Sequence, residues 1–107
     1  MPSYLYRVGY TSQAWAALAK SPQNRVEAVR PVVEGLGGKV TSAFFTFGKD
    51  DIILICEMPD NASAAAFSIA ATAGGSVSHV HTTPLMTIDE GMSAMKKAAG
   101  TSYRPPA

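Results

Sequence analysis

Residues 39–58 read KVTSAFFTFGKDDIILICEM, and this stretch decides the fold. Two runs rich in β-branched and aromatic residues, 39–47 and 51–58, flank the short segment Gly48-Lys49-Asp50. A glycine-containing loop between two such runs is typical of a β-hairpin, because glycine permits the backbone angles of a tight turn. The stretch therefore predicts two neighbouring antiparallel strands.

The residues before the hairpin predict a strand followed by helix. Residues 3–10 alternate in character, so that Tyr4, Tyr6, Val8 and Tyr10 share one face of a strand. A short helical segment anchored by Trp15 follows it.

A longer helix is expected next. Ser21-Pro22 predicts its start, since proline suits the first helical position, and Gly37-Gly38 predicts its end.

The residues after the hairpin repeat the helix-then-strand order. A helix is predicted at 61–73 and a strand at 76–83, and Thr87 predicts the cap of a last helix that reaches about Ala99. The complete order is β-α-β-β-α-β with a terminal helix. This order predicts an α+β, ferredoxin-like fold, in which a four-stranded antiparallel sheet carries two helices on one face. We expect one domain over residues 1–100 and an extended tail over 101–107.

Composition limits the classes of function. The chain has 107 residues and a net charge of +1, and its lysines and arginines are not clustered, which argues against nucleic-acid binding. No apolar run approaches the roughly 18 residues of a membrane span, and the N-terminal pattern is not that of a signal peptide, so we expect a cytoplasmic protein. The single cysteine, Cys56, lies in an apolar run and is expected to be a buried, inert thiol.

The predicted hairpin is apolar on both faces. Ile52–Cys56 is apolar throughout, and strict alternation places Val40 and Phe44 on one face of the preceding strand and Phe45 and Phe47 on the other. A sheet with one face in water should alternate apolar with polar residues instead. Only 16% of the residues are charged, which also favours burial of a second surface. We therefore expect a homo-oligomer, a dimer or larger, whose sheets pair face to face; the alternative is a monomer whose terminal helix folds back over the open face.

The chain resembles the GYD-domain family of small bacterial and archaeal proteins. The resemblance is carried by Met1–Leu5 followed by Tyr10-Thr11, by Phe47–Ile53, by Pro59–Ala65 and by Thr82–Thr87. In one respect the chain departs from the family pattern, because Asp50 stands where a tyrosine usually precedes the aspartate, while Gly48 and Asp51 are retained. The resemblance implies a dimeric α/β barrel of ferredoxin-like subunits and leaves the function open, since the family is uncharacterised and similar barrels serve many functions.

His79 and His81 are the main candidates for chemistry. Two residues apart on a strand, they emerge on one face about 7 Å apart, close enough to ligate one zinc or copper ion, with Glu57 or a residue of a second subunit as a further ligand. The alternative is a pair of half-buried histidines at a subunit contact. No particular cofactor is implied.

Arg7 is a charge in the middle of a predicted inner strand. If it faces the cavity of a barrel, its guanidinium is suited to hold an anionic or carbonyl-bearing ligand. The alternatives, equally expected, are an ion pair with Glu57 or a position at the rim of the barrel. A structural role in the hairpin explains Gly48 and Asp51 without any catalysis, because glycine permits a positive φ and the carboxylate can accept backbone hydrogen bonds.

Two functions remain open at the level of sequence. The first is a non-catalytic oligomeric module that holds a small apolar or aromatic molecule. The second is a small dimeric-barrel enzyme, of the cofactor-independent oxygenase or isomerase type, that uses His79, His81 and Arg7. No catalytic serine–histidine–aspartate set, glycine-rich phosphate loop or pair of catalytic carboxylates can be assembled from the sequence.

Overall fold

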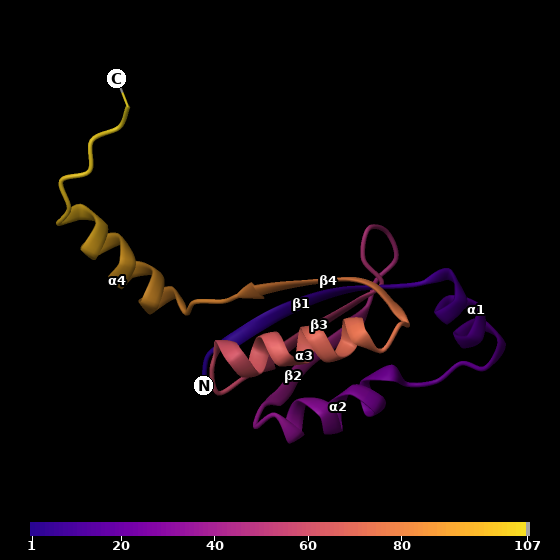
Figure 1. Ribbon diagram of the computed structural model, residues 1–107. Helices are drawn as coiled ribbons and strands as arrows, with labels where there is room; N and C mark the ends of the chain where they lie inside the picture. The colour runs from indigo at the N-terminus through magenta and orange to yellow at the C-terminus, as the bar shows by residue number, and fades with distance from the viewer. Residues whose placement is uncertain (107) are drawn as a thin grey trace.

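A computed structural model describes residues 1–106; Ala107, the last residue of the expected tail, lies outside the described residues. The four strands form one antiparallel sheet in the order β2-β3-β1-β4 (Figure 1). The elements are β1 (Ser3–Tyr10), α1 (Ser12–Lys20), α2 (Arg25–Gly35), β2 (Lys39–Phe45), β3 (Ile52–Glu57), α3 (Asn61–Ala73), β4 (Val77–Pro84) and α4 (Ile88–Ala99). Helices α2 and α3 lie on the same side of the sheet (Figure 1), so the predicted ferredoxin-like α+β fold is confirmed.

The core lies between the sheet and these two helices. The predicted tyrosine face of β1 is buried there, and Tyr6 is fully buried. Its hydroxyl donates a hydrogen bond of 3.0 Å to the backbone oxygen of Ala64, and its ring meets Phe67 edge to face at 4.9 Å. Burial raises the pKa of Tyr6 to about 12, because the ionised phenol would lose its hydration. The small residues of α3 allow this close approach between helix and sheet.

The start of α2 differs from the prediction made from Ser21-Pro22. Helix α2 begins at Arg25, and its N-cap is Asn24, whose side chain accepts a 3.0 Å hydrogen bond from the backbone N–H of Val26. Ser21 ends α1 instead, where its N–H donates to the backbone oxygen of Ala17 at 2.9 Å. Asparagine caps a helix at least as well as serine, and in this structure Asn24 rather than Ser21 caps α2.

A β-bulge in β2 overturns the predicted faces of that strand. Val40 pairs with Cys56 and Ser42 pairs with Ile55, which leaves Thr41 as an extra residue between the two pairs. The extra residue reverses the alternation, so Val40 lies in the core while Phe44 lies on the opposite face, beside Ile53. The prediction that Val40 and Phe44 share a face is therefore wrong.

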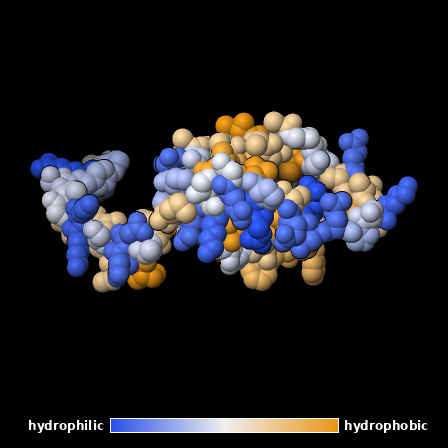
Figure 2. Space-filling view, turned by 90° about the horizontal axis from the view of Figure 1, so that it is seen from below, coloured by the Kyte–Doolittle hydropathy of each residue, from blue (hydrophilic) through white to orange (hydrophobic). Residues whose placement is uncertain are grey.

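Helix α4 stands away from the rest of the molecule. Thr87 and Glu90 form a reciprocal capping box at its start, yet none of its residues is buried. It extends beyond the end of β4 (Figure 1), and in the view of Figure 2 it is a separate lobe on a narrow neck. The radius of gyration of 17.2 Å accordingly exceeds the value of about 13 Å typical of a compact domain of this length. The alternative in which the terminal helix covers the open sheet face is therefore wrong.

Over residues 1–106, every helix is too short or too polar to cross a bilayer.

Cys56 is expected to resist thiol reagents in the folded protein. Its side chain is fully buried, and burial raises its pKa to about 11, so the reactive thiolate is scarce at pH 8. Reaction with a chromogenic disulfide should proceed at the rate of unfolding and become immediate in denaturant. Rapid labelling without denaturant would show that β3 opens locally.

Candidate functional site

The face of the sheet that is turned away from α2 and α3, termed the open face below, gathers the predicted site residues. Leu5, Arg7 and Gly9 alternate onto it from β1. The antiparallel register sets Ile53 and His81 on either side of Arg7, and His79 beside Gly9. Arg7, His79 and His81 therefore lie together at the end of the sheet nearest the β2–β3 loop.

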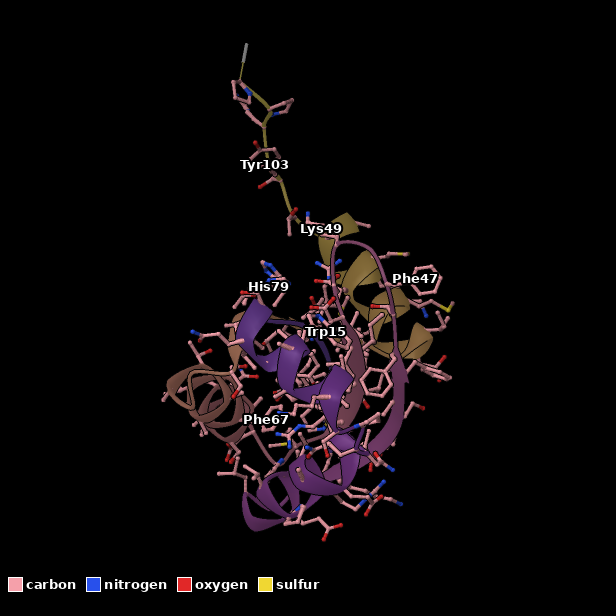
Figure 3. All side chains as sticks on the ribbon, turned by 90° about the vertical axis from the view of Figure 1, so that its right-hand side faces the viewer. Trp15, Phe47, Lys49, Phe67, His79 and Tyr103 are labelled. Carbon is pink, nitrogen blue, oxygen red and sulfur yellow. The ribbon has the colours of Figure 1, made fainter. Side chains whose placement is uncertain are left out.

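His79 is held in place by the loop. Its Nε2 lies 3.0 Å from Oδ1 of Asp50, and its Nδ1 lies 3.2 Å from the Ser78 hydroxyl. The ring covers Gly9 so closely that a Cβ at that position would overlap it. Gly9 thus provides the space that the ring occupies, and Asp50 orients the ring (Figure 3 labels His79 and the nearby Lys49 at the loop).

Asp50 is a site residue that the sequence did not identify. The chain departs from the family pattern at this position, and that departure is the feature of the sequence that could have identified Asp50 as a site residue. Its carboxylate reaches a histidine 29 residues away because the β2–β3 loop projects from the end of the sheet on the side away from α2 and α3 (Figure 1). No local pattern encodes that approach.

His81 continues the cluster toward Arg7. The rings of His79 and His81 have centroids 5.1 Å apart and are tilted by 46°. His81 is exposed, and it pairs across the strands with Arg7. The two imidazoles and the guanidinium therefore form one polar patch, next to the apolar centre of the open face at Ile53.

Glu57 lies away from this patch. Arg7 pairs with Ile53, whereas Glu57 pairs with Ser3. Glu57 follows Ile53 by four residues along β3, which separates their backbones by roughly 13 Å at the rise of a strand. Within one chain Glu57 is thus neither the ion-pair partner of Arg7 nor a ligand beside the histidines. Across residues 1–106, no three histidine, cysteine or acidic side chains come close enough to hold a metal ion, so the predicted site at His79 and His81 would need a ligand from another copy.

Gly48 and Asp51 shape the loop. Gly48 has a φ of 148°, a conformation that favours glycine. Asp51 accepts a 2.7 Å hydrogen bond from the N–H of Tyr10 through its carboxylate, and its own N–H donates to the backbone oxygen of Val8 at 2.8 Å. These bonds tie the loop to the end of β1 and so fix the position of the neighbouring Asp50.

Trp15, Phe47 and three exposed methionines lie outside the cluster. The Trp15 ring contacts Tyr10 edge to face at 5.4 Å, which anchors α1 to the end of β1. Met86, Met92 and Met95 are exposed on and before α4. Phe47 is fully exposed and points away from the body of the molecule (Figure 3).

Replacing Gly9 with alanine is expected to displace His79 and leave the fold intact. The new methyl group takes the space of the imidazole, which can rotate away, so the cost in unfolding free energy should be about 1–3 kcal/mol. The His79 ring signals should move in a proton–nitrogen NMR spectrum, as they should in Asp50→Asn. An unchanged His79 environment in Gly9→Ala would contradict the described packing.

Comparison with known proteins supports the fold and the family. A family model described as GYD domain matches residues 4–95. Among solved structures, the crystal structure of MtbAldR, a Mycobacterium protein, is similar with a TM-score of 0.58 and 16% identity. The match covers 80% of this chain and 53% of that one, so the chain spans about half the length of that protein, and the likeness concerns the fold alone. No curated protein matches the chain.

Proposed function

The chain belongs to the GYD-domain family, and we propose that it works as a homo-oligomeric binding module whose open sheet faces pair and enclose a small ligand. The observation that carries this proposal is the apolar character of the open face. Ile53, Ile55 and Leu5 lie at its centre, and the neighbouring Phe44 is 68% exposed. Both helices of the core pack on the other side, and α4 extends away.

A second copy is the cover that fits this face best. Two sheets packed face to face bury such side chains in a layer about 10 Å thick. The face also carries Arg7 toward one end and Glu57 at the other. A two-fold axis that runs across the strands would bring each Arg7 near Glu57 of the partner subunit, so the charges favour pairing with an identical face.

Helix α4 supplies a second argument for assembly. Ile88, Met92 and Met95 recur at a helical spacing on one side of it, and all three are exposed. An isolated helix of about three turns is marginal in water without tertiary packing. Packing of this stripe on another copy would stabilise α4 and would permit assemblies larger than a dimer.

The ligand site of the proposed assembly is the polar patch of Arg7, His79 and His81. Pairing of the open faces would enclose this patch between the two sheets, near Glu57 of the partner subunit, where water is largely excluded. Two imidazoles and a guanidinium in such a chamber favour a small, mainly apolar molecule with a carbonyl group.

Sedimentation of the full chain tests the assembly directly. A dimer or larger species is expected at micromolar concentration, with no folded monomer until high dilution. A monomer that stays monomeric at high micromolar concentration would refute the proposal.

A second candidate function rests on the contact between His79 and Asp50. A carboxylate that orients an imidazole is an arrangement used in general acid–base catalysis, and His81 stands beside it. An isomerase acting on a carbon next to a carbonyl would exchange that carbon's proton with solvent. Carbonyl compounds incubated in heavy water should then incorporate deuterium, and His79→Ala should abolish the incorporation; binding without exchange favours the non-catalytic module.

A further inference from the structure

An apolar cavity lies on the opposite side of the sheet from the polar patch. It has a volume of about 320 Å³ and is lined by α2, α3 and the strands beneath them. This volume falls at the lower end of the roughly 300–1,000 Å³ of small-molecule sites. It suits a compact ligand with one ring or a short chain.

Most of the cavity wall is apolar. Val8 and Leu54 form its floor, Val29 lines it from α2, and Phe67 (labelled in Figure 3) lines it from α3. These side chains offer no hydrogen bonds, so the body of a ligand that fits here is apolar.

The polar side chains gather at one end of the cavity. Tyr10 ends β1 and Arg25 begins α2, and both contribute to the lining. The Arg25 guanidinium donates a 2.9 Å hydrogen bond to the neutral side-chain amide of Gln23. In the part of the chain that the structure describes, no carboxylate lies within ion-pair distance of Arg25.

The phenol of Tyr10 lies within the field of the Arg25 charge. Burial raises the pKa of Tyr10, the positive charge of Arg25 and its hydrogen bond to the phenol oppose that shift, and the negative charge of Asp51 adds to it. A hydroxyl and a guanidinium that flank one end of an apolar cavity provide two donors for the two oxygens of a carboxylate.

We propose that this cavity binds a compact monocarboxylate with an apolar body, such as an aryl or short alkyl alkanoate. The carboxylate pairs with Arg25 and the Tyr10 hydroxyl, and the apolar body lies against Val29, Leu54 and Phe67. The site is separate from the polar patch, because the sheet lies between them.

Calorimetric titration of the full chain with 3-phenylpropanoate tests this assignment. The acid should bind, the matched 3-phenylpropanamide should bind at least about ten-fold more weakly, and 3-phenylpropylamine should not bind, because only the acid carries a negative charge that pairs with the Arg25 guanidinium and the ammonium group is repelled by it. Arg25→Gln should reduce the affinity for the acid to that for the amide. Arg30→Gln is the matched control, since Arg30 lies on the same helix but faces Glu27 at 3.8 Å, and it should leave the affinity unchanged.

Methyl NMR locates the ligand. Leu54 and Ile53 are adjacent in sequence and point to opposite faces of β3, so Leu54 should shift on addition of the acid while Ile53 stays still. Equal affinity for acid and amide, or unchanged binding in Arg25→Gln, would overturn the inference. A shift of Ile53 alone would also overturn it, and would place the ligand in the chamber proposed between the sheets.

Discussion

Replacing Leu54 with alanine is expected to lower the free energy of unfolding by about 2–5 kcal/mol. Leu54 is 1% exposed and lies in β3, an inner strand, under the helical layer. Its removal enlarges the cavity between α2 and α3, and the cost of such substitutions grows with the volume left empty. Small domains commonly have only 5–15 kcal/mol of stability, so the loss is a large share of the total.

Denaturant unfolding followed by circular dichroism measures this loss. Protein concentration must be held constant, since assembly would add to the apparent stability. The control is Ile69→Ala on α3, where the side chain is 68% exposed and the change should stay within about 0.5 kcal/mol. A loss below 1 kcal/mol for Leu54→Ala would contradict the described core.

Replacing Ile53 with glutamate is expected to dissociate the proposed assembly. Ile53 lies at the centre of the open face, between Arg7 and Phe44 in the register. In an isologous pairing each substitution introduces two carboxylates into a dry interface, where both lose hydration and repel each other. The dissociation constant should rise at least about 100-fold, which corresponds to roughly 2.7 kcal/mol.

Sedimentation of the variant over a range of concentrations measures this change. Ile69→Glu is the matched control, because the same substitution falls on an exposed isoleucine of the helical layer and should leave the assembly intact. Circular dichroism should show both variants folded. An Ile53→Glu oligomer as tight as the unmodified one would exclude the open face as the interface.

The patterns that the sequence revealed are those whose cause is local. Alternation in residues 3–10 identified the buried tyrosine face, because successive side chains of a strand point to opposite sides. The two-faced apolar run in β3 and the bounds of α3 were also predicted correctly, and capping residues placed the start of α4 at Thr87.

The features that the sequence did not reveal depend on tertiary structure. The bulge at Thr41 reverses the faces of β2, and strict alternation cannot anticipate an inserted residue. Asn24 rather than Ser21 caps α2, although both types suit the position. The contact of Asp50 with His79, and the convergence of Tyr10 and Arg25 on one cavity, join residues that are distant along the chain.

The place of β1 in the sheet also constrains how the chain is made. It is synthesised before the other three strands, yet it lies between β3 and β4, which follow at Ile52–Glu57 and Val77–Pro84. Until those segments emerge, its tyrosine face has no sheet to join, and two unpaired edges are available to other chains. Every pairing of β1 is distant in sequence, so we expect folding to be slow for the size of the chain and largely post-translational.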